Sequence, residues 1–272
     1  MSGIVVTGAS TGIGRGCAIR FAQLGYKVFA GVRNPVDGDA IKSENIQPIL
    51  LDVTSAESIG NAVATIGEQP LQGLINNAGV AIVGPVELVP MEIWRKQFEV
   101  NVLGLVAVTQ AFLPALRRGR GRIVNIGSIA GKSPLPGSGP YDSSKSAVEA
   151  ITDVLRMELQ PVGISVSVIE PGAVATPIWD KSVGDGDELM RHAEPEKAAI
   201  YTRLMKKLRE EATEAARKAI SVDQVVKAVE HAMTAARPKA RYPVGADTRF
   251  WLLLNLLPDR WRDWLILSHF NK

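Results

Sequence analysis

The sequence predicts an α/β fold: a single, doubly wound parallel sheet with seven strands and with helices on both faces. Short runs rich in β-branched residues alternate with longer segments of helical periodicity, as in a parallel sheet with crossover helices. The short runs are continuously apolar, as strands buried on both faces are. The first run leads into a glycine-rich turn, and such turns join strand to helix at phosphate-binding sites.

The apolar runs place the strands, in chain order, at residues 4–7, 27–32, 48–52, 73–76, 122–126, 165–170 and 241–244. The helices are expected at residues 13–24, 55–67, about 91–116, about 143–160 and 222–235. Gly25 closes the first helix, because glycine accepts the positive φ of a helix C-cap. Ser55 and Ser221 are expected N-caps, because a serine hydroxyl accepts a hydrogen bond from the first helical turn.

The composition is that of a soluble globular protein, with 272 residues, 46% hydrophobic and 22% charged. A net charge of only +3, without a basic run interleaved with aromatics, argues against a nucleic-acid partner. The single cysteine, Cys17, cannot form an internal disulfide, which suits a cytoplasmic location. A strand that begins near Gly3 leaves no room for a signal peptide, and no apolar stretch approaches the roughly 20 residues that span a bilayer. We expect no metal site.

The glycine-rich turn predicts a dinucleotide site. It reads Thr7-Gly8-Ala9-Ser10-Thr11-Gly12-Ile13-Gly14, and its glycines let a pyrophosphate approach the N–H groups at the start of the following helix. The spacing G-x-x-x-G-x-G differs from the commonest fingerprint, and a purely structural turn is the alternative. A P-loop is excluded, because no Lys-Ser/Thr pair follows the glycines. The predicted cofactor-binding residues here are Gly8, Ser10, Thr11, Gly12, Ile13 and Gly14.

Arg33 follows the second strand, where an acidic residue would bind the ribose 2′-hydroxyl of NAD(H). A guanidinium at this position suits a 2′-phosphate, because it donates two parallel hydrogen bonds. A solvated surface arginine is the alternative. We favour NADP(H) as the cofactor, with NAD(H) still open.

Tyr141 and Lys145 are four residues apart and lie on one face of the expected helix. An isolated phenol has a pKa near 10, and we expect the neighbouring ammonium to lower it towards the working range of an acid/base catalyst. Ser128 ends a strand upstream and is placed to bind a substrate oxygen. A nucleophilic role for Ser128 does not fit, because its surroundings are not G-x-S-x-G.

These motifs, taken in order, resemble the short-chain dehydrogenase/reductase family, in the branch with the T-G-x-x-x-G-x-G turn and Y-x-x-x-K. The resemblance covers about residues 3–244. It rests on Thr7–Gly14, Asp52, Asn76-Asn77-Ala78-Gly79, Asn101, Ser128, Tyr141 with Lys145, and Pro171-Gly172 with Thr176.

The resemblance implies that the fold is a Rossmann-type domain and that Asn101, Ser128, Tyr141 and Lys145 are catalytic. Asn101 would hold a water that links Lys145 to solvent. The further residues that it implies in cofactor binding are Asp52, Val53, Asn77, Ala78, Gly79, Tyr141, Lys145, Pro171, Gly172, Val174 and Thr176. Asn77 and Asn101 could instead be structural, and Asp52 the cap of the next turn.

One domain is expected, with residues 1–246 forming its dinucleotide-binding and catalytic part. Residues 180–187 are polar and contain glycine, and a charged helical stretch follows them to about Lys218. Because α/β folds place lids in such insertions, residues 180–218 are expected to form a substrate lid. Ile200, Leu204 and Leu208 form a stripe there that would either face a lipophilic substrate or simply pack. The Asp142 carboxylate, beside Tyr141, is expected to face solvent.

Residues 247–272 form an apolar, tryptophan-rich C-terminal extension that holds three of the five tryptophans. It would pack over the substrate pocket or against a partner subunit. A competing interpretation makes it a peripheral membrane contact, with Trp and Leu in the lipid and Arg249, Arg260 and Arg262 near the headgroups. The family resemblance also implies a homodimer or homotetramer that pairs the helices at 91–116 and 143–160.

The sequence thus predicts an NADP(H)-dependent oxidoreductase that interconverts a hydrophobic secondary alcohol and its ketone, steroid-, retinoid- or lipid-like. Hydroxysteroid, retinol and 3-hydroxybutyrate dehydrogenases are the branches it most resembles. The alternatives are a catalytically silent dinucleotide-binding regulator and an NAD(H)-dependent dehydrogenase of a short 3-hydroxy acid. A nucleotide-sugar epimerase fits less well, because that group favours a T-G-x-x-G-x-x-G turn and a larger C-terminal domain.

Overall fold

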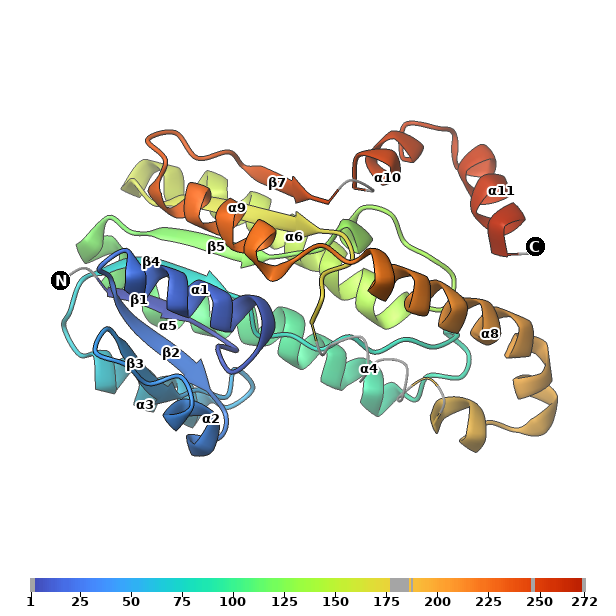
Figure 1. The fold of residues 1–272 in the computed structure, drawn as a ribbon, viewed down its shortest axis with the longest axis horizontal. Coiled ribbons are helices and arrows are strands. Elements are labelled where there is room, and N and C mark those ends of the chain that lie inside the picture. The colour runs from blue at the N-terminus through green and yellow to red at the C-terminus, as the bar shows by residue number, and fades with distance from the viewer. Residues whose placement is uncertain (1–2, 177–185, 187, 246–247, 271–272) are drawn as a thin grey trace.

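The computed structural model describes residues 3–176, 186, 188–245 and 248–270 (Figure 1). These residues form a seven-stranded, wholly parallel sheet in the order β3-β2-β1-β4-β5-β6-β7. The strands are β1 (Gly3–Val6), β2 (Lys27–Val32), β3 (Ile46–Leu50), β4 (Leu71–Asn76), β5 (Arg122–Ile126), β6 (Ser165–Pro171) and β7 (Arg241–Val244). The predicted fold class is confirmed, and the α/β sheet is Rossmann-like.

Two strands differ from the expected bounds by two residues. Strand β3 begins at Ile46, which pairs with Val28, and the chain leaves the sheet after Leu50, which pairs with Val32. Strand β4 begins at Leu71 because that residue still pairs with Gly3 of β1. The strand order reverses between β1 and β4, and ligands of open α/β sheets bind at the carboxyl ends of strands beside such a reversal.

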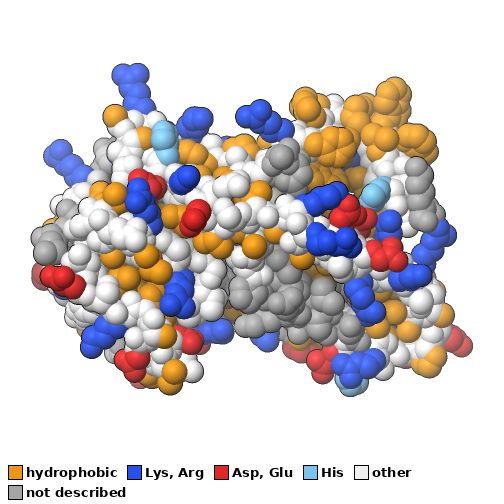
Figure 2. All heavy atoms as spheres, viewed as in Figure 1, with side chains coloured by type: hydrophobic (Ala, Val, Ile, Leu, Met, Phe, Trp, Pro, Cys, Tyr) orange, Lys and Arg blue, Asp and Glu red, His pale blue; other side chains and the backbone are white. Residues whose placement is uncertain are grey.

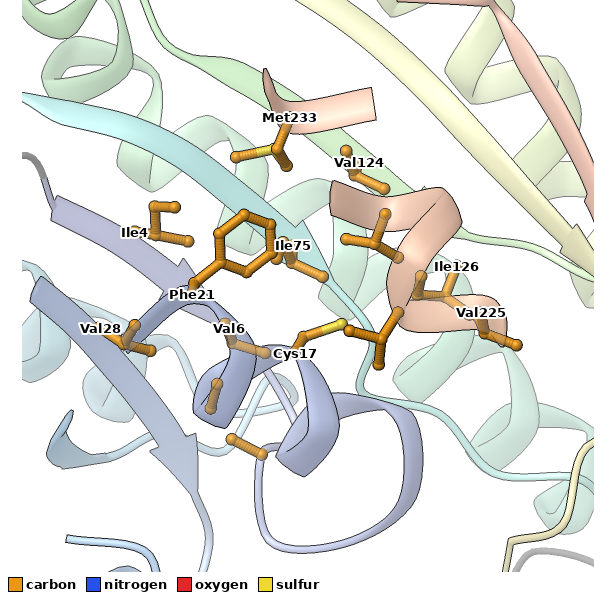
Figure 3. Close-up of a cluster of buried hydrophobic side chains, with 14 of the residues drawn as sticks. Ile4, Val6, Cys17, Phe21, Val28, Ile75, Val124, Ile126, Val225 and Met233 are labelled. Atoms are coloured by element: carbon orange, nitrogen blue, oxygen red, sulfur yellow. The ribbon is translucent and has the colours of Figure 1, made fainter. Parts of the chain in front are cut away.

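Helices α1 (Gly12–Gln23) and α9 (Val222–Thr234) pack side by side on one face of the sheet. Figure 3 shows their contact with the strands, where Phe21 and Cys17 of α1 meet Val225 and Met233 of α9. Burial raises the pKa of the Cys17 thiol to about 12, so it stays protonated and serves as a small core side chain. The other face is covered by α3 (Ala56–Ile66), α5 (Gly104–Gly119) and α6 (Gly139–Leu159).

The helix expected at 91–116 is continuous from 91 to 119 but not uniform. It consists of α4 (Met91–Phe98), a π-helical turn (Glu99–Leu103) and α5. Contrary to the expectation that no such stretch exists, Met91–Gly119 is long and apolar enough by length and composition to cross a membrane. Half of its most apolar window is buried inside the fold, as in the core helix of a soluble protein.

The helix boundaries follow the local chemistry. The Ser55 hydroxyl accepts a hydrogen bond from Ser58 N at 3.1 Å, which confirms this N-cap, and Gly25 has the expected positive φ of 84°. Ser221 precedes α9 but makes no side-chain capping bond among the described residues, so that expectation was wrong. Helix α6 begins at Gly139 rather than 143, because Pro140 is well suited to the first helical turn.

Further helices follow β2, β6 and β7. Helix α2 (Pro35–Asp39), which the sequence analysis did not predict, follows β2 and is capped by the Asn34 side chain. Helix α8 (Pro195–Lys218) is the charged stretch of the expected lid, whereas residues 180–185 and 187 lie outside the described residues. The C-terminal extension forms α10 (Thr248–Leu254) and α11 (Asp259–Phe270), which Figure 1 places at the end of the molecule near α8.

Candidate active site

The predicted site residues follow the carboxyl ends of the parallel strands and therefore meet at one edge of the sheet. The glycine turn follows β1, Arg33 follows β2, and Asp52 comes two residues after β3. Asn77 follows β4, and Ser128 comes two residues after β5. Gly172 follows β6, and the turn between β1 and α1 lies beside the point where the strand order reverses.

The turn between β1 and α1, called the glycine cradle below, requires glycine at three positions, because a Cβ there would crowd neighbouring atoms of the chain or strain the backbone. Gly8 and Gly12 have positive φ values of 63° and 54°, which favour glycine. A Cβ on Gly14 would lie 2.3 Å from the Gly8 carbonyl oxygen, so no other residue fits there. The Thr11 side chain makes no capping bond to α1 among the described residues, and Ser10 and Ile13 are partly exposed beside it. Such a turn at a helix N-terminus suits a pyrophosphate.

Asn77 holds this turn from the end of β4. Its Nδ2 donates to the carbonyl oxygens of Thr7 and Gly8 at 3.0 Å each. The Thr7 hydroxyl in turn accepts hydrogen bonds from the N–H groups of Asn77 and Ala78 at 2.9 Å. The Asn77 side chain therefore has a structural role in shaping the cradle, while Ala78 and Gly79 continue along its edge.

Arg33 and Asp52 lie close together at the ends of β2 and β3. The Arg33 side chain is exposed, and Val53 beside them is buried. Hydrogen bonds from the Thr54 N–H and hydroxyl lower the pKa of Asp52, and the Arg33 charge lowers it further. Asp52 therefore caps its own turn through Thr54, as the alternative interpretation expected, and leaves the Arg33 guanidinium facing solvent at the site's edge.

Tyr141 and Lys145 lie in the first turns of α6, next to Ser128. The Lys145 ammonium donates to the Ile126 carbonyl oxygen at 2.8 Å and lies 5.7 Å from the centroid of the Tyr141 ring. Lys145 and Ser128 are both buried, each with 8% of its surface exposed. The structure thus brings together the phenol, the ammonium and the hydroxyl that the sequence singled out.

The pKa of Tyr141 moves opposite to the sequence expectation. Burial raises it to about 12, a hydrogen bond with Ser128 acts to lower it, and the Asp142 charge raises it. Burial also lowers the pKa of Lys145 to about 8, against the charge of Glu149. The ammonium donates to the Ile126 carbonyl rather than to the phenol oxygen, and desolvation is the largest influence on the pKa of Tyr141.

Asn101 lies in the π-helical turn, and its side chain connects two backbone segments. Its Oδ1 accepts from Val80 N, and its Nδ2 donates to Val80 O, both at 2.9 Å. The same Nδ2 also donates to the Ser144 hydroxyl of α6 at 3.1 Å. The expected role of Asn101 in holding a water for Lys145 stays a prediction, because these bonds concern only its side chain. They support a structural role, in which Asn101 fixes α6 next to the loop after β4.

The segment after β6 returns to the glycine turn. Gly172 N donates to Val244 O at 2.9 Å, and Val174 is buried in a bridge with Ile220. The Thr176 methyl group lies 3.1 Å from the position that a Cβ on Gly12 would take. The segment from Pro171 to Thr176 therefore links the end of β6 to the glycine turn. The family resemblance implies that it contacts the dinucleotide there.

Asp142 is buried, contrary to the expectation that its carboxylate faces solvent. Only 4% of its surface is exposed, and its Oδ2 accepts a hydrogen bond from Leu135 N at 2.8 Å. Because Pro140 starts α6 early, Asp142 lies in the first helical turn and points at the loop between Ser128 and α6. Because an aspartate is usually exposed, the sequence gives no sign that Asp142 anchors this loop, and only the contact with Leu135 reveals it.

Helix α8 and the C-terminal extension also contact that loop. Leu208 of α8 reaches within 2.2 Å of the position that a Cβ on Gly137 would take, so Leu208 packs on the loop. The Ser133 hydroxyl donates to Trp251 O at 3.2 Å, and Asn255 Nδ2 donates to the Ser133 hydroxyl at 2.8 Å. Ile200, in contrast, is 68% exposed, so it does not share the packing of Leu208.

Two buried side chains of this region were not singled out in the sequence. Gln97 is fully buried, accepts from Ile82 N at 2.9 Å and donates to Val80 O at 2.8 Å. Glu149 lies one helical turn beyond Lys145 and is 4% exposed. The sequence signal that could have found Glu149 is its position four residues after Lys145, on the same face of the helix. In the described part of the chain, no cluster of three or more His, Cys, Asp and Glu side chains could hold a metal ion.

Comparisons with known proteins agree with this geometry. Residues 2–186 match the family model described as short chain dehydrogenase. A 3-amino-tetrahydro-pyrrolizinone reductase of Xenorhabdus hominickii is 42% identical over 74% of this chain and 71% of its own. An NADPH-dependent 3-dehydrocapnine reductase of Ornithobacterium rhinotracheale is 36% identical over 98% of this chain and 97% of its own. The crystal structure of a Burkholderia cenocepacia short chain dehydrogenase in complex with NADP has a TM-score of 0.74 and 26% identity, and covers 95% of this chain and 94% of its own.

The burial of Asp142 predicts a pH-dependent effect of Asp142→Asn on stability. Burial raises the pKa of Asp142 from 3.8 to about 7, although the Leu135 N–H acts to lower it. A raised carboxyl pKa stabilises the fold at low pH, and this contribution is lost as the pH rises from 3.8 to about 7. An asparagine keeps the Leu135 bond without a charge. We expect thermal unfolding of Asp142→Asn to shift upward by roughly 2–4 °C at pH 8, and little at pH 4.

Asp153→Asn, in the same helix, is the control. Hydrogen bonds from Arg241 and Arg156 lower the pKa of Asp153, so its carboxylate stabilises the fold above the ordinary pKa of an aspartate. This variant should therefore melt lower than the wild type at pH 8. A lower melting temperature of Asp142→Asn at pH 8 would show instead that the Asp142 carboxylate is ionised and stabilising.

Proposed function

The chain belongs to the short-chain dehydrogenase family of oxidoreductases, and we propose that it interconverts a hydrophobic secondary alcohol and its ketone with NADP(H). The arrangement of Tyr141, Lys145 and Ser128 carries this proposal. A partly buried phenol, a buried ammonium and a buried serine hydroxyl meet at the sheet edge next to the glycine cradle. This set can bind a carbonyl oxygen and supply a proton to it.

The residues present fit a nicotinamide dinucleotide. The cradle of Gly8, Gly12 and Gly14 would hold the pyrophosphate, because it leads into the N-terminus of α1, whose first N–H groups favour an anion. Arg33 would bind the 2′-phosphate at the end of β2, and the NADPH-dependent relative and the NADP-bound structure support that choice. When bound, the nicotinamide would supply or accept the hydride.

The protein's own groups would handle the proton. Tyr141 would donate its hydroxyl proton to the substrate oxygen in reduction, while the Ser128 hydroxyl hydrogen-bonds to the same oxygen. With its pKa raised to about 12, Tyr141 is protonated at neutral pH and ready to act as the acid. The reverse reaction requires the phenolate, which the Lys145 ammonium would stabilise as long as it keeps its charge below about pH 8.

An apolar wall supports a hydrophobic substrate. Leu208 of α8 packs against Gly137, and Leu189 approaches Gly84 so closely that a Cβ there would lie 2.9 Å from its Cδ1. Gly84 and Gly137 are joined by a backbone hydrogen bond of 2.6 Å, so both leucines meet the same side of the molecule. The substrate class, steroid-, retinoid- or lipid-like, is proposed from this wall. A catalytically silent regulator is the competing function, and turnover decides between them.

Tyr141→Phe should lower the turnover number by at least a hundredfold, because it removes the proton donor and leaves the ring in place. The binding of NADPH, measured by its fluorescence, should stay nearly unchanged. Tyr201→Phe is the control, because the Tyr201 hydroxyl donates to the exposed Glu87 on the surface at 2.8 Å. Near-normal turnover of Tyr141→Phe would contradict the assignment.

Arg33→Ala should weaken NADPH binding roughly tenfold or more, the loss expected for charge-assisted hydrogen bonds to one phosphate. Binding of NADH, which lacks the 2′-phosphate, should change little. Titrations of both cofactors against wild type, Arg33→Ala and the remote surface variant Arg117→Ala measure this. A wild-type preference for NADH would refute the role of Arg33 and favour the NAD(H)-dependent alternative.

We also propose that the chain forms homodimers or homotetramers through the helices at 91–119 and α6. Leu103, Val154 and Met157 on these helices are large apolar side chains that are at least 47% exposed. Burial of such side chains against a second copy would remove apolar surface from water.

The exposed tail supports a contact with a membrane surface. Figure 2 shows hydrophobic side chains gathered over α10 and α11. Phe250, Leu253, Leu256, Trp261 and Trp264 are 59–80% exposed. Tryptophans and leucines next to Arg249 and Arg260 fit the boundary between acyl chains and anionic headgroups.

The wild type should float with vesicles of anionic lipid, and Trp261→Ser/Trp264→Ser should lose most of this binding, because both tryptophans face outward. Val36→Ser removes an apolar side chain that is 71% exposed, outside the tail and the proposed subunit interface, and should float like the wild type. Absence of flotation would contradict the membrane contact. A change of oligomeric state in the tryptophan variant would instead assign the tail to a subunit interface.

A further inference from the structure

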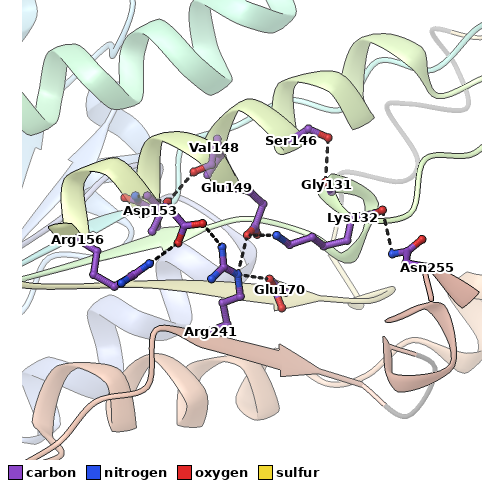
Figure 4. Close-up of polar contacts among 12 residues, drawn as sticks. Gly131, Lys132, Ser146, Val148, Glu149, Asp153, Arg156, Glu170, Arg241 and Asn255 are labelled. Atoms are coloured by element: carbon purple, nitrogen blue, oxygen red, sulfur yellow. Dashed lines mark hydrogen bonds and ion pairs between the residues drawn. The ribbon is translucent and has the colours of Figure 1, made fainter. Parts of the chain in front are cut away.

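Two buried carboxylates, Glu149 and Glu170, lie together behind the proposed catalytic residues (Figure 4). Glu149 comes from α6, one turn after Lys145, and Glu170 comes from the end of β6, just before Pro171. Their side chains are almost completely removed from solvent, with 5% and 2% exposed. The mechanism proposed above uses neither of them, and buried acids at such a place need a physical reason.

Cations from two further elements face the pair. Glu149 Oε2 lies 3.1 Å from Lys132 Nζ, on the loop after Ser128, and 3.2 Å from Arg241 Nε, at the start of β7. Arg241 Nε also lies 3.4 Å from Glu170 Oε1.

Two other charged groups of α6 belong to the same network. Asp153 binds Arg241 and Arg156, so part of the Arg241 charge is neutralised away from the two glutamates. The charge of Glu149 also acts to raise the pKa of the Lys145 ammonium, against the larger lowering by burial. Helix α6 therefore carries both the proposed catalytic ammonium and the acids that surround Arg241.

One oxygen of each glutamate has no hydrogen-bond donor among the described residues. Glu149 Oε1 and Glu170 Oε1 are both buried and unsatisfied, which is costly for two ionised carboxylates but not for a pair that shares a proton. Burial raises the pKa of Glu170 to about 7, and the negative charge of Glu149 acts in the same direction, while Lys132 and Arg241 act to lower the pKa. A protonated Glu170 would supply the missing donor.

The pair sits directly against the backbone that carries Ser128. Glu149 Oε1 lies 3.2 Å from the position that a Cβ on Gly127 would take. Gly127 stands between Ile126, whose carbonyl binds Lys145, and Ser128. Gly127 N also donates to Ile169 O, next to Glu170, at 2.8 Å. Any movement of the two carboxylates would therefore shift the ends of β5 and β6 relative to α6.

We propose that Glu149 and Glu170 are positioning residues that share one proton and hold the Ser128 turn, the end of β6 and helix α6 in one geometry. The ion pairs of Glu149 with Lys132 and Arg241 anchor the turn after Ser128 from one side and β7 from the other. The shared proton prevents repulsion between the two acids. This inference rests on the function proposed above, because its catalytic readout requires Ser128 and Tyr141 to act on a substrate.

Glu170→Gln and Glu149→Gln, made in the full chain, separate the two roles. Glutamine at 170 imitates the protonated acid, so at pH 6.5 kcat should stay within about threefold of wild type. The decline of kcat at alkaline pH should begin about one pH unit higher in this variant, because the pair can no longer lose its proton. Glutamine at 149 removes the anion facing Lys132 and Arg241 and should lower kcat roughly tenfold already at pH 6.5, through a misplaced Ser128. NADPH binding should change less than twofold in both variants, a negligible free-energy difference.

A second readout does not depend on activity. Because the pKa of Glu170 is raised from 4.5 to about 7, wild type should lose thermal stability relative to Glu170→Gln as the pH rises through this range. An unchanged difference in melting temperature between pH 5 and pH 8 would overturn the shared proton. An unaltered pH profile of kcat in Glu170→Gln, or parallel losses of kcat and NADPH binding in Glu149→Gln, would overturn the positioning role. If no ketone is turned over by wild type, the proposed function fails, while the melting curves still test the pair.

Discussion

The hydrogen bond from the Lys145 ammonium to the Ile126 carbonyl oxygen ties helix α6 to the carboxyl end of β5. A lysine so deeply buried loses the solvation of its charge, and this bond replaces part of it. Because Tyr141 and Lys145 are on one helix and Ser128 follows Ile126 by two residues, this one contact sets how the three groups meet. The remaining structure of the site serves to keep this contact in place.

Several polar anchors share that task, and each joins elements far apart in the sequence. Asn101 binds Ser144 of α6 to the loop after β4, Asp142 binds the loop around Leu135, and Glu149 binds Lys132 and Arg241. The glycine cradle is shaped in the same manner by the Asn77 amide. Helix α6 is thus fixed at successive turns by side chains that point inward, and these contacts position Tyr141 and Lys145 relative to the ends of the strands.

The fold was predictable because its signals are local. Continuous apolar runs specify buried parallel strands, and Gly25 and Ser55 end and begin helices through their own backbone or side chain. The juxtaposition of Ser128, Tyr141 and Lys145 was also predictable, since parallel strands end at one edge. The roles of Asp142 and Glu149 were not, because a buried acid looks like a surface acid until its partners are known. The pKa of Tyr141 was predicted in the wrong direction, because desolvation depends on three-dimensional packing and not on helical spacing.

The decisive measurement is the NADPH-dependent reduction of a panel of apolar ketones by wild type and by Lys145→Met, which replaces the ammonium with an uncharged side chain of similar length. If the ammonium at Ile126 organises the site, wild type reduces at least one ketone and Lys145→Met loses turnover by roughly a hundredfold or more. Thermal unfolding of both proteins tests whether Lys145→Met keeps the wild-type fold. Equal turnover by a folded Lys145→Met, or no turnover of any ketone by wild type, would contradict the catalytic role assigned to this helix.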